Sequence, residues 1–196
     1  MNYQVFPLFT RTITLLFFLI GFAFCLFGIS ALLTYSIVVG LFFPVGISMR
    51  LHRLNETGLA LTLTEDTRWI TYIHGFPAKE QRDVIKNPCF WSTERTRQFF
   101  LRCFASKMIL QAACIAILAC DVLSSEGDAV TAILALLALL ALLFLLYMSG
   151  QSAYSFYLLA TNQWQCESLT TSGGSIWYQG FLPKKEGKDT LFARLF

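Results

Sequence analysis

Two long stretches of the 196-residue chain contain no lysine and no arginine. They run from Thr12 to Met49 and from Met108 to about Leu159, and both are strongly apolar. The fifteen basic residues all lie outside these stretches: Arg11, a group between Arg50 and Lys107, and a group between Lys184 and Arg194. Cytoplasmic loops of multi-pass membrane proteins keep Lys and Arg, whereas translocated loops have few of them. The pattern therefore predicts a polytopic membrane protein.

Charged residues are scarce, at 14% of the chain against about 25% in soluble domains, and 56% of the residues are hydrophobic. The net charge of +3 is too small to indicate nucleic-acid binding. The six cysteines include no CxxC pair, so the sequence supports neither a disulfide framework nor a zinc knuckle. It also lacks a Gly-rich phosphate loop, a GxSxG elbow and an HExxH motif. We expect no metal site and no cofactor.

The chain has only two histidines, so it has few candidate catalytic residues. His52 follows Arg50 closely and is expected to be solvated or to face lipid. A cysteine hydrolase or transferase is the weaker, enzymatic alternative. It would use His74 with one of the cysteines outside the predicted spans, which are Cys89, Cys103 and Cys166. We therefore expect a protein that is not an enzyme.

The uncharged block after Arg11 is too long for one span, since as a helix it would be nearly twice as long as a hydrocarbon core of about 30 Å. We expect it to reverse near residues 28–30 and to be kinked by Pro44. Glu126 and Asp128 divide the second block with a short acidic loop, which belongs on the translocated side. A cleavable signal peptide is the competing interpretation of the first span. The predicted spans are Ile13–Ile29, Ala31–Met49, Lys107–Leu123 and Ala129–Met148.

The predicted fold is mainly α, with four transmembrane helices as two hairpins and small cytoplasmic α+β lobes. We expect an integral protein of the cell inner membrane, with both termini in the cytoplasm. The chain divides into an N-terminal tail with the first transmembrane hairpin (1–49) and a cytoplasmic segment with a β-hairpin and amphipathic helices (50–106). The second transmembrane hairpin (107–149) and a C-terminal cytoplasmic segment (150–196) follow.

Each cytoplasmic segment carries signals for short elements. In the first, β-forming residues on both sides of Glu65–Arg68 predict a β-hairpin, and Pro77 is expected to open a helix over Ala78–Ile85. A second helix is predicted to start at Ser92 or Thr93 and to run into the third span. In the C-terminal segment, Glu167–Thr171 and Ser175–Tyr178 predict another hairpin. The entry helix carries arginines for anionic lipid head groups, namely Arg95, Arg97 and Arg102.

A short motif recurs in the two cytoplasmic segments. Tyr72–Asp83 resembles Trp177–Asp189, with Gly, Phe, Pro, Lys, Glu and Asp in the same order and a one-residue insertion at Leu182. The echo suggests a two-fold internal repeat of membrane hairpin plus lobe. Its aromatic residues fit either a docking platform or an interfacial aromatic belt. The candidate interaction residues are Trp69, Tyr72, Gly75, Phe76, Pro77, Trp177, Tyr178, Gly180, Phe181 and Pro183.

The external turns are too short to hold a ligand-binding domain, so partners must be met in the bilayer or at the cytoplasmic face. We expect an accessory or regulatory protein that docks a larger envelope complex, of the secretion, conjugation/exclusion or immunity type. Its partners are the lipid bilayer and either another membrane protein or a second copy of the chain. The alternative is a small transporter or channel subunit built from two repeats, using Asp121 and Gln111. A hydrated acid at a helix end is the simpler interpretation of Asp121.

Overall fold

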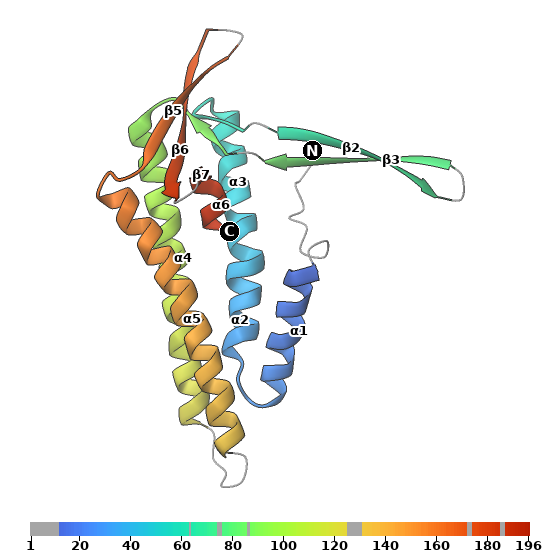
Figure 1. The fold of residues 1–196 in the computed structure, drawn as a ribbon, viewed down its shortest axis with the longest axis vertical. Coiled ribbons are helices and arrows are strands. Elements are labelled where there is room, and N and C mark those ends of the chain that lie inside the picture. Colours follow the sequence, from blue (N-terminus) through green and yellow to red (C-terminus); the bar gives the residue numbers. More distant parts are fainter. Residues whose placement is uncertain are drawn as a thin grey trace.

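The computed structural model describes residues 12–62, 64–73, 76–85, 87–124, 131–171, 174–184 and 187–196. Most of these are helical, and a small antiparallel sheet lies at one end of the helices (Figure 1). Three helices are long and apolar enough to cross a membrane, namely Ala31–Glu56, Thr93–Leu123 and Leu134–Ala160. At about 1.5 Å per residue each is longer than a hydrocarbon core of about 30 Å, so each extends beyond that core.

The first apolar block folds back on itself where the sequence predicts a reversal. Helix α1 (Thr12–Leu26) is separated from α2 (Ala31–Ile37) by a turn in which Gly28 has a φ of +88°, a conformation that favours glycine. An ideal Cβ on Gly21 would lie 3.2 Å from the Cα of Leu33, so the two helices pack closely. The described part of α1 extends only about 22 Å, and a fourth span therefore stays a prediction.

Pro44 lies within a continuous helix rather than at the end of one. The chain passes from α2 through a π-helical turn, η1 (Val38–Phe42), into α3 (Phe43–Glu56). A proline ring lacks an N–H and crowds the preceding turn, and a π-helical turn is one way to absorb such a mismatch. The N–H of Phe43 bonds to the C=O of Val38, so the hydrogen-bond ladder is already shifted where Pro44 enters.

Helices α4 (Thr93–Leu123) and α5 (Thr131–Ala160) form the second helical hairpin and pack along each other. Ser92 occupies the N-cap position of α4, as predicted, although its side chain makes no capping hydrogen bond. The helix runs without interruption from the basic entry segment into the third predicted span, which confirms a continuous entry helix. The acidic loop predicted between the hairpin's two helices lies outside the described residues.

A five-stranded antiparallel sheet joins the central and C-terminal segments. Its order is β1 (Ala60–Leu61), β4 (Cys89–Phe90), β6 (Ile176–Lys184) and β5 (Gln165–Thr170), and β7 (Gly187–Thr190) also pairs with β6. The pairing of β5 with β6 confirms the hairpin predicted in the C-terminal segment. The short helix α6 (Leu191–Leu195) follows, and the Thr190 hydroxyl oxygen at its N-cap accepts a hydrogen bond from the Ala193 N–H at 3.1 Å.

The central segment corrects two expectations. Strand β2 (Thr64–Ile73) runs through Glu65–Arg68, where the sequence predicts a turn, and pairs along its whole length with β3 (Phe76–Ile85). The predicted helix over Ala78–Ile85 is wrong, because these residues form β3. Pairing with β2 supplies the backbone hydrogen bonds of this segment, and Pro77 is tolerated because both strands of a two-stranded ribbon are edges. Pro183 likewise lies within β6 and opens no helix.

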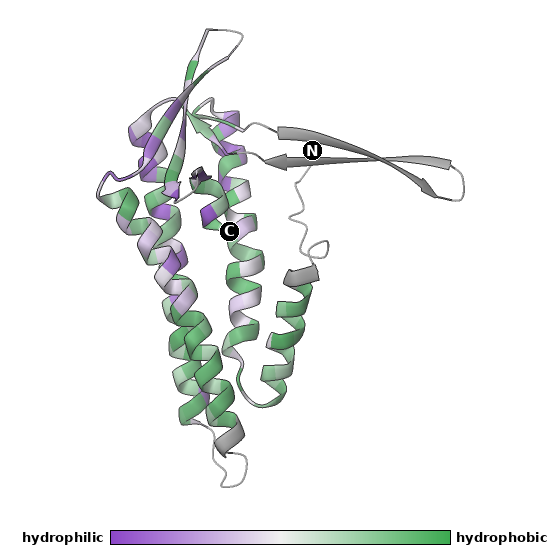
Figure 2. Ribbon diagram, in the orientation of Figure 1, coloured by the Kyte–Doolittle hydropathy of each residue, from purple (hydrophilic) through white to green (hydrophobic). Residues whose placement is uncertain are grey.

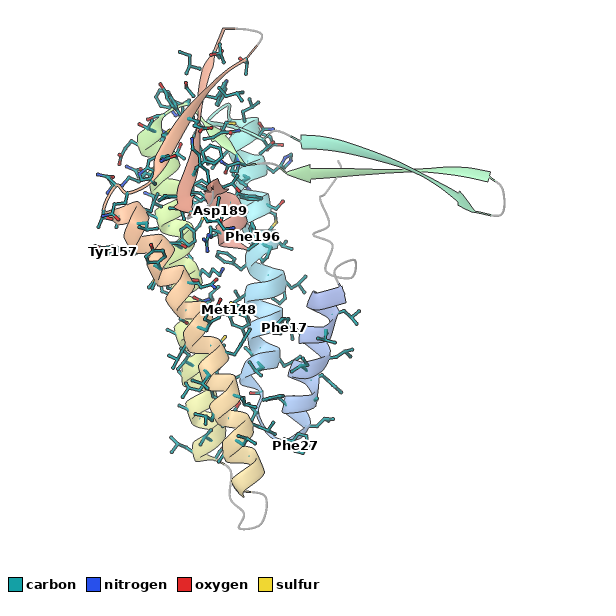
Figure 3. All side chains as sticks on the ribbon, viewed as in Figure 1. Phe17, Phe27, Met148, Tyr157, Asp189 and Phe196 are labelled. Atoms are coloured by element: carbon teal, nitrogen blue, oxygen red, sulfur yellow. The ribbon has the colours of Figure 1, made fainter. Side chains whose placement is uncertain are left out.

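Two clusters of buried apolar side chains stabilise the fold. One lies under the five-stranded sheet, where the rings of Phe90, Phe99 and Phe100 have centroids 5.0 to 6.3 Å apart. The other lies between the helices and includes Leu118 and Leu145. Figure 2 shows hydrophilic residues at the sheet end and apolar residues along the rest of the helices. Labelled side chains in Figure 3 follow this division, with Phe27 at the far end of the helices and Asp189 beside the sheet.

Candidate functional site

The first group of predicted interaction residues lies on the β2–β3 ribbon, residues 64–73 and 76–85, which we call the arm. Trp69 and Tyr72 belong to β2, and Phe76 and Pro77 begin β3. Gly75 lies outside the described residues. The register pairs Tyr72 with Pro77 beside the turn, so the group occupies the half of the arm that is farther from the five-stranded sheet.

The arm stands apart from the rest of the molecule. In Figure 1 it extends sideways from the sheet end of the helices, and its residues contact mainly one another. An isolated two-stranded ribbon is marginally stable in water, and each of its strands has an unpaired edge of backbone N–H and C=O groups. A third strand, or a surface that covers the ribbon, would pair the free backbone groups and stabilise the ribbon. The arm is therefore the candidate docking surface.

The second group of predicted interaction residues is part of the five-stranded sheet. All its members lie in β6, where Tyr178 pairs with Phe90 of β4 and Phe181 pairs with Gln165 of β5. Pro183 is exposed, Gly180 is buried, and the aromatic members are half-buried. The group is Trp177, Tyr178, Gly180, Phe181 and Pro183. These residues are therefore packed within the five-stranded sheet.

Gly180 lies where β6 meets α4 and α6. An ideal Cβ on this residue would be 2.3 Å from the Cδ1 atom of Leu191 and 3.3 Å from side-chain atoms of Thr96 and Trp164. Its carbonyl oxygen accepts a hydrogen bond from the Asn87 amide at 2.9 Å, which ties the central segment to the C-terminal one. Replacing Gly180 together with its neighbours would disturb the sheet as well as any partner. No local signal in the sequence predicts this role of Asn87.

The repeated motif occupies different places in its two copies. Phe76 is the first residue of β3, immediately after the ribbon turn, whereas Gly180 and Phe181 lie inside β6. What does recur is the order of elements, because each helical hairpin is followed by a β-hairpin. The internal repeat stays a prediction.

Asp121 caps a neighbouring helix. Its carboxylate accepts hydrogen bonds from the backbone N–H of Ser30 at 2.7 Å and of Ala31 at 3.2 Å, and from the Ser30 hydroxyl at 3.0 Å. The first turn of a helix has N–H groups without intrahelical partners and a positive dipole end, so a carboxylate there is stabilising. Asp121 thus links α4 to the start of α2. The contact was not predicted, because Ser30 and Ala31 lie about ninety residues from Asp121 in the sequence.

Gln111 lies inside the helical bundle. Its side chain is fully buried in α4, beside Tyr35 of α2. Within the described part of the chain, neither its amide oxygen nor its amide nitrogen has a hydrogen-bond partner of acceptable geometry. A buried amide of this kind costs about 1–3 kcal/mol, and polar groups in spans often mark pathways.

The three arginines predicted for anionic lipid have different surroundings. Arg97 donates hydrogen bonds to the carbonyl oxygens of Leu159 at 3.2 Å and Ala160 at 2.8 Å, so it caps the C-terminus of α5. Arg95 lies over the ring of Trp91 at 5.4 Å from its centroid, and Arg102 is exposed. Of the three arginines predicted to bind lipid, Arg97 therefore already binds carbonyl groups of the protein.

The candidate catalytic residues form no cluster of three within the described part of the chain, and His74 lies outside it. Burial raises the pKa of the Cys89 thiol, partly offset by a hydrogen bond from Gln179, and burial together with Glu167 raises the pKa of Cys166. A raised pKa disfavours the thiolate, which is the nucleophilic form. His52 lies 3.3 Å from Glu56 on α3, where both side chains are exposed. Cys103 is buried, and no three His, Cys, Asp or Glu residues cluster in the described ranges.

No family model, curated protein or solved structure matches this chain.

Proposed function

We propose that this protein is a non-enzymatic, multi-pass inner-membrane protein that docks a larger envelope complex through the arm. In this topology the predicted segment Ile13–Ile29 forms a fourth span, and both termini are cytoplasmic. The support is the distribution of charge along α3 and α4, whose basic residues lie in the parts nearer the sheet, namely Arg50, Arg53, Arg95, Arg97, Arg102 and Lys107. Figure 2 shows this end of the helices as the more hydrophilic one. Lys and Arg are retained on the cytoplasmic side of membrane proteins.

The observation that carries the docking role is the isolation of the arm. Its two ten-residue strands pair with each other and have no comparable contact with the helices or the sheet. Because a ribbon of this kind is marginally stable alone, a partner that adds a strand or covers a face would stabilise it. The aromatic residues near its turn, Trp69, Tyr72 and Phe76, are of the types that dominate binding energy at interfaces.

The test is affinity purification of the tagged protein from its native membrane in mild detergent, with quantitative mass spectrometry of the bound proteins. We expect a stoichiometric envelope protein with the wild type. The arm variant carries Trp69→Ser, Tyr72→Ser and Phe76→Ser, and we expect it to lose most of that partner while its insertion is unchanged.

The matched control removes exposed aromatic residues elsewhere. Tyr154 and Tyr157 on α5 are 61% and 55% exposed, so a variant with both changed to Ser tests whether any exposed aromatic pair would matter. Retention of the partner by the arm variant, or equal loss in both variants, would contradict docking through the arm. Recovery of the wild type alone, as a monomer or homo-oligomer, would also contradict it.

The second candidate function is transport, and the unpartnered amide of Gln111 favours it. The capping contacts of Asp121 give that residue a structural task on the same helix. We expect Gln111→Leu to leave the helices folded because it removes a buried unpaired group. A loss of flux in a folded Gln111→Leu variant would support transport, and unchanged flux would count against it.

A further inference from the structure

A groove of about 310 Å³ lies at the sheet end of the helices, between α3 and α4. Three arginines line it: Arg50 from α3, and Arg95 and Arg102 from α4. Gln98 adds an amide, and the remaining lining is apolar, with Leu54, Leu59, Phe90 and Phe99. The groove therefore has both cationic and apolar residues in its lining.

The arginines of the groove have no acidic partner among the residues that the structure describes. None of its three guanidinium groups takes part in an ion pair with another residue in the described ranges. Glu94, on the same helix, accepts a hydrogen bond from Gln98 at 3.0 Å instead of pairing with an arginine. Arg97 is not part of the groove, because it caps α5.

The groove continues into the apolar surface of the helices. Arg95, Arg102 and Ile109 follow one another at seven-residue intervals, so they share one face of α4. Ile109 is 70% exposed, and Met49, which precedes Arg50 on α3, is 53% exposed. An amphiphile with an anionic head and apolar chains matches this order of surfaces along α4.

We propose that the groove binds the head group of an anionic phospholipid from the leaflet at the sheet end. The phosphate lies among Arg50, Arg95 and Arg102, and the acyl chains follow the face that contains Ile109. Guanidinium groups bind phosphate through paired N–H donors, and basic clusters at a membrane surface favour anionic lipid. This site goes beyond the docking role and does not depend on the arm.

The test uses the full-length protein, purified in mild detergent, with native mass spectrometry during titration of phosphatidylglycerol. Phosphatidylcholine and inorganic phosphate are titrated in parallel. The groove variant replaces Arg50, Arg95 and Arg102 with Gln. The control variant replaces Arg53, Lys184 and Lys188 with Gln, which removes the same charge from the same end of the molecule outside the groove.

We expect the wild type to bind phosphatidylglycerol more tightly than phosphatidylcholine. Each arginine removed should weaken binding about fivefold, so the groove variant loses on the order of a hundredfold and the control less than about twofold. If the triple variant does not fold, the single variant Arg102→Gln replaces it, and we expect it to bind phosphatidylglycerol about fivefold more weakly than the wild type. Equal weakening in the groove and control variants, equal binding of the two lipids, or displacement of lipid by millimolar inorganic phosphate would overturn the proposal.

Discussion

The two β-hairpins of this protein differ in what surrounds them. Strands β5 and β6 belong to a five-stranded sheet that packs on α4 and α6, and Gly180 is buried there against Leu191. The arm, formed by β2 and β3, pairs only with itself among the described strands. One hairpin is therefore part of the core of the molecule, and the other is an appendage whose stability depends on what it meets.

The difference shows that a shared sequence motif does not imply a shared role. The residues around Gly75 and Gly180 are similar in order, yet Phe76 begins β3 whereas Gly180 and Phe181 lie in the interior of β6. Packing partners decide between these outcomes, because Leu191, Thr96 and Trp164 surround Gly180. We expect substitutions in the sheet to change global stability and substitutions in the arm to change binding alone.

The largest effect is expected at Gly180. Gly180→Ala forces a Cβ against the buried Leu191 side chain, and overpacking of this kind lowers the free energy of unfolding by about 1–3 kcal/mol. Chemical denaturation in detergent measures it. The control is Gly150→Ala, where a Cβ meets no atom within 4 Å and the helix gains propensity. Equal stability of the two variants would show that β6 is not packed against α6 as described.

Asn87 gives the next largest effect because its amide bonds to the Gly180 carbonyl oxygen across the sheet. Asn87→Ala leaves that acceptor without its partner, which should lower the free energy of unfolding by about 1–2 kcal/mol. Asn55→Ala, at an exposed position on α3, is the matched control and should have little effect. The same denaturation assay distinguishes them, and a neutral Asn87→Ala would break the proposed link between the two segments.

Removal of the arm should matter less to stability than either point change. Replacing residues 64–85 with a short Gly/Ser linker removes an element that contacts mainly itself, so the unfolding free energy of the remainder should change by less than about 1 kcal/mol. Partner recovery should be lost in the same variant. A large loss of stability would show that the arm packs on the rest of the protein.

The smallest effect is expected at the rim of the sheet. Lys188 and Glu167 form an ion pair between β7 and β5, with side chains 49% and 50% exposed. Exposed pairs contribute about 0–1 kcal/mol and are screened by salt. Lys188→Ala should therefore lower the unfolding free energy by less than about 0.5 kcal/mol, with the difference vanishing in 1 M salt. A larger, salt-independent loss would place this pair in the core of the sheet.

Local signals were sufficient for some of these elements. The reversal near Gly28, the start of α4 after Ser92 and the β5–β6 hairpin all follow from nearby residues, and the structure contains them. The helix expected after Pro77 failed because pairing with β2, a contact outside the local window, overrides local propensity. The arginines show the same limit, since the partner of Arg97 lies at the end of α5, far away in the sequence.

By itself the sequence determined that the chain has long apolar helices and that its basic residues lie outside the two apolar blocks. Those features depend on hydrophobic runs and charge, which are local and additive. Only the tertiary structure decided which residues have partners within the protein. In the structure, Asp121 contacts the start of α2, Arg97 caps the end of α5 and Gly180 lies in the core. The arm and the arginines of the groove have no comparable partners among the described residues. These assignments depend on contacts between distant segments, and no short stretch of sequence specifies them.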